Sequence, residues 1–519
     1  MKAVKKALAA LCCLMLLLPA LSALADDSFN MNRDGFSTSY TYGYDYWGDV
    51  QESPDAYRVS AVFDFKKLGL EDNPKEKKPV KAQSMFVRND DLYIVDRDNN
   101  RILQVKCGEE SYTLTRVIDT VNGCELSTFK TPYDVYVDAD DNIYVADYGN
   151  FRVVMMDKDL NWIKEFVKPT DSTFDQSKDF LPKKIVVDVA GRLYVLATNI
   201  YNGIVKYEAD GTFTGYIGAN KVSVNMADYI WKKYFQTQAQ RDASAAFVPT
   251  EYANVYIDKD GFIYATTTNF SQYDLKSNVA RPIRRLNGLG NDILIRNDRY
   301  PPIGDLWWLE SDNTGAYGPS KMVDITVLDN EIYVALDTTR GRLFGYDNQG
   351  VMLWAFGTKG NIDGAFMNAI SIEHRGLDLF VLDESGGRVT VFTPTEYGML
   401  IYNAIEKYQE GKYDESAAIW QEVLKHNSNY PLAFRGIGRA VLRQDKFEEA
   451  MEYFKMAHDR ENYGRAFKLY RKEWIEKNIL WVFLVVLALV AVLLTLGRIK
   501  KMKWEVMAHE YSKVRKNIG

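Results

Sequence analysis

The chain has 519 residues, of which 47% are hydrophobic and 26% are charged. This length exceeds one ordinary domain, and the composition can build packed cores, which excludes an intrinsically disordered chain. The whole chain carries −6, and the segment between its basic leader (+3) and basic tail (+5) carries −14. A segment with this much negative charge repels nucleic acid, so the sequence argues against nucleic acid as a partner.

Residues 1–25 have the organisation of a secretory signal peptide. Three lysines precede an apolar run over 7–18, and the tripeptide Ala-Leu-Ala at 23–25 is a small-x-small cleavage pattern. We therefore expect export of the mature chain. Its two remaining cysteines, Cys107 and Cys124, could pair in an oxidising compartment, and the sequence leaves both states open.

A short pattern recurs six times over residues 57–394. The first two copies read DDLYIVDRDNNRILQV at Asp90–Val105 and DNIYVADYGNFRVVMM at Asp141–Met156. One aromatic residue anchors each copy: Tyr93, Tyr144, Tyr194, Tyr264, Tyr333 and Phe380. The spacings of 51, 50, 70, 69 and 47 residues indicate a period near 50 with two insertions.

Each copy predicts a four-stranded antiparallel meander. In the second copy the alternation places strands at 133–138, 143–146, 151–157 and 162–167, separated by Asp, Gly and Asn clusters. Six such units predict a mainly β protein, a six-bladed β-propeller.

The two ends of the predicted ring complete one blade. The last copy has three clear strands and turns helical after Pro394. The orphan strand YRVSAVFDF at 57–65 precedes the first copy, so we expect it to supply the missing strand of the sixth blade and close the ring.

The repeat core resembles the NHL repeat. The resemblance is strong in the first, second and sixth copies, whereas the fourth lacks the Asp-to-Arg core. It implies a propeller in a membrane protein of envelope assembly, transport support or sensing. The matching residues are Asp96, Asn99 and Arg101 in the first copy and Pro132, Asp138, Tyr144, Val145, Ala146, Asp147, Asn150 and Arg152 in the second.

Aspartates recur after the second strands, as Asp96, Asp147 and Asp383. In gluconolactonase-like propellers, which resemble this fold, such carboxylates hold calcium in the channel and support hydrolysis. The alternative is that each Asp pairs with the Arg five residues later and fixes a loop. We favour pairing, because an active site occurs once whereas these residues recur in several blades. We therefore assign no catalytic residue, metal or other cofactor.

His374 is the one histidine of the predicted propeller, and we interpret it as a turn residue. A zinc site would need about three protein ligands.

Two insertions and one long loop fall on one face of adjacent blades, at 220–249, 297–319 and 269–279. Loops on a rigid scaffold are common binding sites. The insertions carry aromatic side chains that could form a platform for a sugar or peptide, or could pack the insertions onto the propeller. The candidate binding residues are Trp231, Tyr300, Trp307 and Trp308.

Residues 395–477 change to a helical period. Positions 34 apart match, such as Ala404 with Gly438 and Trp420 with Phe454, which is similar to the tetratricopeptide repeat. This helical module is either a spacer or a surface for docking a peptide or protein.

Residues 479–497 carry no charge and are long enough to cross a bilayer of about 30 Å. The tail at 498–519 is basic, which marks a cytoplasmic end. We therefore expect a single-pass cell-membrane protein with its N-terminal bulk extracytoplasmic.

Two functional hypotheses remain. The first is a membrane-anchored binding or scaffold protein that captures a protein or carbohydrate-type ligand and works with an extracytoplasmic or membrane partner. The second is a metal-dependent hydrolase with calcium in the propeller channel. The scarcity of histidine and the lack of a nucleophile motif favour the first.

Overall fold

The computed structural model describes residues 41–45, 47–66, 68, 80–108, 111–218, 252–270, 274–275, 280–296, 300–306 and 318–517. The expected signal peptide at 1–25 lies outside these residues. The chain divides into two compact units, residues 1–399 and 400–519, and each is considered by itself.

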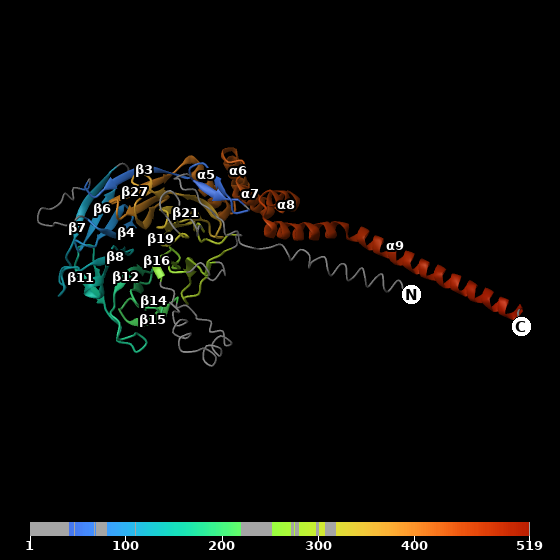
Figure 1. The fold of residues 1–519 in the computed structure, drawn as a ribbon, viewed down its shortest axis with the longest axis horizontal. Coiled ribbons are helices and arrows are strands. Elements are labelled where there is room, and N and C mark those ends of the chain that lie inside the picture. Colours follow the sequence, from blue (N-terminus) through green and yellow to red (C-terminus); the bar gives the residue numbers. More distant parts are fainter. Residues whose placement is uncertain are drawn as a thin grey trace. The chain divides into compact units, whose positions relative to one another are not determined.

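Six antiparallel sheets make up the first unit, which confirms the predicted six-bladed β-propeller. The innermost strands β4, β8, β12, β16, β19 and β25 contact one another in sequence, and β25 returns to β4 (Figure 1). Blade I consists of β4 (Ala82–Arg88), β5 (Asp91–Asp96), β6 (Arg101–Cys107) and β7 (Tyr112–Ile118). Blade II consists of β8 (Pro132–Val137), β9 (Ile143–Asp147), β10 (Arg152–Met156) and β11 (Trp162–Phe166).

The remaining blades follow in chain order. Blade III consists of β12 (Pro182–Val187), β13 (Leu193–Ala197), β14 (Ile204–Tyr207) and β15 (Phe213–Ile217). Blade IV has three described strands, β16 (Tyr252–Ile257), β17 (Ile263–Thr267) and β18 (Ile283–Leu286). Blade V contains β19 (Met322–Val327), β20 (Tyr333–Asp337), β21 (Arg342–Tyr346) and β22 (Met352–Phe356). Blade VI contains β25 (Ala369–Arg375), β26 (Asp378–Asp383) and β27 (Arg388–Pro394), and two short parallel strands, β23 (Thr358–Lys359) and β24 (Ala365–Phe366), precede it.

Burial explains the strand patterns. Every residue of β9 is buried, because its sheet is covered on both faces by neighbouring blades. The outer strand β7 instead alternates between exposed and half-buried residues. Apolar clusters fill the space between successive blades, so the core is a ring of interfaces between sheets.

Strand β3 (Tyr57–Asp64) closes the ring, as predicted. It pairs antiparallel with β27 in blade VI, with Ala61 opposite Val391 and Tyr57 opposite Pro394. Segments more than 300 residues apart thus share one sheet, which ties the start of the propeller to its end.

Blades IV and V depart from the expected four strands. Blade V has six, because a hairpin of β1 (Tyr42–Tyr44) and β2 (Val50–Glu52), which the sequence did not predict, joins β22. In blade IV, residues 292–296 replace a regular outer strand. There the amide of Ile293 donates to the carbonyl of Arg285 at 2.7 Å.

Five helices make up the C-terminal part: α5 (Glu396–Gln409), α6 (Tyr413–His426), α7 (Pro431–Arg443), α8 (Phe447–Met456) and α9 (Arg460–Asn517). The 34-residue offset is present in the structure, since Tyr413 and Phe447 begin α6 and α8. Glycines lie where the helices cross: a Cβ on Gly438 would lie 2.8 Å from the Phe454 ring.

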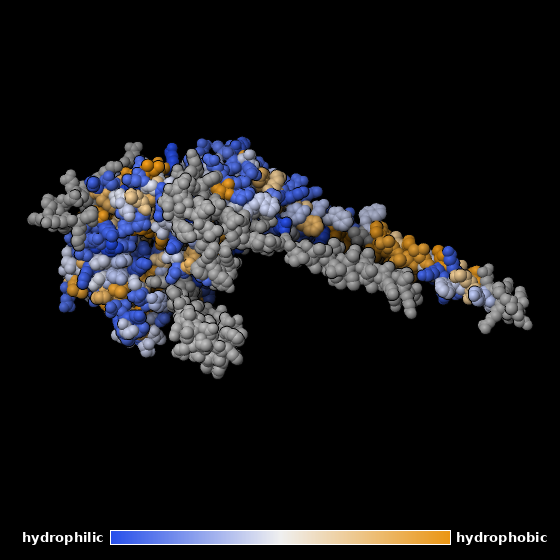
Figure 2. Space-filling view, viewed as in Figure 1, coloured by the Kyte–Doolittle hydropathy of each residue, from blue (hydrophilic) through white to orange (hydrophobic). Residues whose placement is uncertain are grey.

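The predicted third helix and the apolar segment belong to one continuous helix, α9. Its stretch Phe483–His509 is the one candidate membrane span among the described residues, and the apolar window within it has a mean hydropathy of 2.3. Figure 2 shows the apolar surface of this part of α9, followed by hydrophilic residues toward the C-terminus. The candidate span overlaps the expected segment 479–497.

Candidate functional site at the propeller axis

The innermost strands bring equivalent residues to the propeller axis. Each first strand starts opposite the last residue of the second strand, and a bulge follows in every blade. The register therefore defines two rings of side chains at different levels along the axis, which we call the upper ring and the lower ring. The upper ring contains Ser84, Asp134, Lys184, Asn254, Asp324 and Ser371. The lower ring, two residues further along each strand, contains Phe86, Tyr136, Val186, Tyr256, Thr326 and Glu373.

Side chains of the upper ring join neighbouring blades. Asp134 of blade II accepts a hydrogen bond from the amide of Ile185 in blade III at 2.9 Å. Its counterpart three blades away, Asp324, accepts one from the amide of Ile372 at 2.8 Å and contacts Asn254. These buried carboxylates therefore stabilise the ring by binding backbone donors of the next blade.

Lys184 is the cation of the upper ring. Its ammonium lies 2.8 Å from Ser84 Oγ and 3.3 Å from Asp134 Oδ1, and Ser84 donates to the same carboxylate. Burial opposes the charge of Lys184, but Asp134 and Asp324 raise its pKa above the ordinary value. A Ser–Lys hydrolytic pair needs a neutral amine to take the hydroxyl proton, so this arrangement does not activate Ser84.

Three of the six lower-ring residues are aromatic. The rings of Phe86 and Tyr136 have centroids 4.7 Å apart, and the Tyr136 hydroxyl donates to the carbonyl of Val187 at 2.9 Å. Phe86, Tyr136 and Tyr256 are half-buried, unlike the fully enclosed core between blades, so part of each side chain stays exposed.

Glu373 is the carboxylate of the lower ring. It is 8% exposed, and no described side chain donates a hydrogen bond to it or forms an ion pair with it. Burial and the nearby charge of Asp324 raise the pKa of Glu373 well above its ordinary value, against the opposing effect of Lys184. The axis thus holds one carboxyl group that no described side chain binds, although the backbone amide of His374 donates a hydrogen bond to it.

His374 is a strand residue of β25, so its interpretation as a turn residue was wrong. Its Nδ1 lies 2.7 Å from Thr326 Oγ1 in blade V. Burial lowers the pKa of His374 to about 4, so the imidazole is neutral at neutral pH.

The repeated aspartates fix loops, as we expected. Asp147 accepts bonds from Arg152 Nε at 3.0 Å and from the amide of Lys130 at 2.8 Å. Asp96 does the same with Arg101 and Lys81. Over the described part of the chain, no three His, Cys, Asp or Glu side chains are arranged to hold a metal ion.

Three candidate residues of the aromatic platform, Trp231, Trp307 and Trp308, lie outside the described residues. The fourth, Tyr300, is 7% exposed. In the segment after Tyr300, Ile303 and Leu306 cluster with Leu275 of the long loop.

Asp305 connects this segment to the β1–β2 hairpin through hydrogen bonds. Its buried carboxylate accepts a hydrogen bond from the Tyr42 hydroxyl at 3.0 Å and also contacts Tyr44 and Arg342. Burial opposes ionisation, but the guanidinium of Arg342 holds the pKa of Asp305 below its ordinary value. The network is consistent with a packing contribution of the insertion.

The two cysteines do not pair in the structure. Cys107 is a buried thiol, and burial raises its pKa to about 11. Cys124 lies 3.2 Å from Arg152 Nη1.

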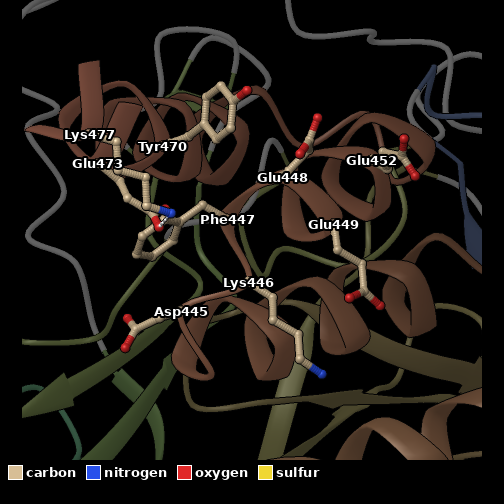
Figure 3. Close-up of a pocket in the computed structure, with 9 residues that line it drawn as sticks. All are labelled: Asp445, Lys446, Phe447, Glu448, Glu449, Glu452, Tyr470, Glu473 and Lys477. Atoms are coloured by element: carbon tan, nitrogen blue, oxygen red, sulfur yellow. Dashed lines mark hydrogen bonds and ion pairs between the residues drawn. The ribbon is translucent and has the colours of Figure 1, made fainter. Parts of the chain in front are cut away.

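A hollow lies within the helical unit. It has a volume of about 480 Å³ and lies between the start of α8 and the N-terminal third of α9 (Figure 3). Carboxylates dominate its open lining, and Glu473 forms an ion pair with Lys477 there. It is lined by Asp445, Lys446, Phe447, Glu448, Glu449, Glu452, Tyr470, Glu473 and Lys477.

The axis residues escaped the sequence analysis, although a signal was present. Asp134, Lys184 and Asp324 each interrupt an apolar first strand at its third residue. A charged residue inside an otherwise buried strand needs a partner, and here that partner lies in another blade.

Comparison with known proteins finds one NHL repeat and several similar solved structures. The NHL repeat family matches residues 129–154. No curated protein gives a match. Similar solved structures include virginiamycin B lyase from Staphylococcus aureus, with 11% identity, a TM-score of 0.36 and coverage of 65% of this chain and 99% of that chain.

Two further propellers come from other organisms. Hydrazine synthase from Kuenenia stuttgartiensis has 13% identity and a TM-score of 0.37, covering 62% of this chain and 97% of that chain. An auxiliary nutrient binding protein from Bacteroides thetaiotaomicron has 12% identity and a TM-score of 0.37, covering 61% and 70%. At such identities the likeness concerns the fold alone.

Proposed function

We propose that this chain is a membrane-anchored extracytoplasmic binding protein whose propeller captures a ligand at its axis and on the face that carries the insertions. The observation that carries the proposal is the set of charged side chains at the axis. Asp134, Lys184, Asp324 and Glu373 come from four blades and influence one another electrostatically. Charged groups gathered on a rigid scaffold are a usual basis for binding.

The C-terminal helices support anchoring and partner binding. The apolar stretch of α9 supports a single-pass anchor, and the basic residues after it support a cytoplasmic tail. The tetratricopeptide-like helices and their acidic hollow would hold a protein partner carrying basic residues. Such a protein would serve envelope transport or sensing.

The four aromatic residues stay part of the proposal. Trp307 and Trp308, with Trp231 and Tyr300, would form a platform beside the axis for a protein or carbohydrate-type ligand. The metal-dependent hydrolase is the second hypothesis from the sequence. No cluster of three or more candidate metal ligands among the described residues supports it.

Photo-crosslinking in living cells tests the proposal. A photoreactive phenylalanine analogue replaces Phe86 at the axis, Trp307 in the insertion or, as control, Val117 on outer strand β7, which is 38% exposed. We expect a specific adduct from position 86 or 307 and none from 117. The same adducts at all three positions, or none at any, would contradict ligand capture.

A further inference from the structure

The lower ring of the axis combines one carboxylate with aromatic faces. Glu373 comes from blade VI, whereas Phe86, Tyr136 and Tyr256 come from blades I, II and IV, all at the same position of the strand register. We propose that this ring binds the alkylammonium group of an organic ligand. The inference rests on the proposed ligand-binding function of the propeller and names the chemistry of that ligand.

The upper ring contains a cationic side chain, whereas the lower ring contains none. In the upper ring Lys184 supplies an ammonium that lies beside Asp134. In the lower ring no position is Lys or Arg, and Glu373 has no side-chain partner among the described residues. Lys184 acts on Glu373 only at a distance, and a buried carboxylate without a cation in direct contact is costly, so an incoming ammonium would stabilise its ionised form.

The lining favours an organic cation over a metal ion. Calcium needs six to eight oxygen ligands, and the described residues provide no cluster of three or more candidate ligands. Aromatic faces attract ammonium groups through their quadrupoles, and a ring of them with one carboxylate is a recurrent solution for alkylammonium ligands. Phe86, Tyr136 and Tyr256 are half-buried, so part of each side chain remains exposed for this contact.

Binding should depend on pH because Glu373 must ionise. Burial and Asp324 favour its protonated form, Lys184 opposes this effect, and Asp134 adds to it. The other titratable neighbours are Tyr136, Tyr256 and His374, which remain neutral near pH 7 because burial raises the pKa of both tyrosines and lowers that of His374. An ammonium ligand would therefore displace a proton from Glu373, and its affinity should increase as pH rises.

Calorimetric titration of the full-length chain in lipid nanodiscs tests the inference. The probe is tetramethylammonium chloride, with sodium chloride as the ionic control, at about pH 7 and about pH 9. We expect saturable binding of the organic cation, tighter at the higher pH, with proton release into the buffer. Glu373→Gln should weaken binding at least about tenfold, whereas Glu125→Gln, an exposed carboxylate on a loop, should not.

A pair of aromatic variants separates recognition from packing. Phe86→Leu removes the ring face and should weaken binding several-fold, whereas Phe86→Tyr keeps the face and should preserve binding. Equal binding of sodium, an unchanged affinity in Glu373→Gln, or no binding by a folded wild-type chain would overturn the inference. If crosslinking still captures a ligand through position 307, the proposed function stands without the ammonium site.

Discussion

Buried charges in the propeller serve two different purposes at the scale of single residues. Those that recur at the ends of several second strands find their partners nearby in the chain, as Asp147 does in Arg152 and Lys130. Those at the axis meet only when the blades form a ring, as Asp134 meets Ile185 of the next blade. The first kind can be predicted from a repeat, because both partners lie within a few residues.

Loss of the loop-fixing carboxylate should destabilise the propeller strongly. Asp147→Ala leaves Arg152, which is 1% exposed, with only its contacts to Glu165, Cys124 and the carbonyl of Leu126. Breaking a buried ion pair on one side costs about 3–5 kcal/mol. Chemical denaturation followed by tryptophan fluorescence should show this loss, whereas Asp157→Ala, on an exposed turn, should change little. A loss below about 1 kcal/mol for Asp147→Ala would contradict the structural assignment.

His374 should make stability depend on pH. Its folded pKa of about 4 lies below the unfolded value of 6.5, so the unfolded chain binds a proton that the folded chain rejects. Stability should therefore fall as pH decreases from about 6.5 to about 4, by up to about 3 kcal/mol. His374→Gln should remove this part of the pH dependence, measured as the free energy of unfolding at several pH values. An identical pH profile in the variant would show that the imidazole is not buried neutral.

Secondary-structure elements show what local pattern can and cannot predict. The strands of blade II match the predicted ranges to within one residue, because alternation and turn residues are both local. The hairpin β1–β2 was missed since its strands have three residues each, and Tyr42 is held by Asp305, 263 residues away. The residues of the upper and lower rings were missed for the same reason. They come from different blades and lie close together only when the six blades form a closed propeller.

Ring closure by β3 can be tested through its register. Ala61 and Val391 lie opposite each other, so Ala61→Cys with Val391→Cys in a Cys124→Ser background should form a disulfide on oxidation. The bond would join distant segments and should raise the unfolding temperature. The control pair Ala61→Cys with Val389→Cys is two residues out of register and should crosslink poorly. Equal crosslinking of both pairs would contradict the closure.

The whole molecule combines a closed propeller, helix pairs and a long helix that contains one candidate membrane span among the described residues. Each part follows from a different period in the sequence: near 50 residues for blades, 34 for helix pairs and an uninterrupted apolar run for the span. Periods of this kind predict architecture well. They do not predict a ligand, because binding residues depart from the repeat, as Glu373 does among the lower-ring residues of the other blades.

Cysteine labelling in intact cells measures most directly whether the propeller faces outward from a membrane. Val189, 95% exposed on a propeller turn, and Ser512, in the basic tail, would each be replaced by Cys in the Cys124→Ser background. A membrane-impermeant maleimide should label Val189→Cys in intact cells and Ser512→Cys only after lysis. Labelling of Ser512→Cys in intact cells, or of Val189→Cys only after lysis, would contradict an extracytoplasmic binding protein anchored by its C-terminal helix.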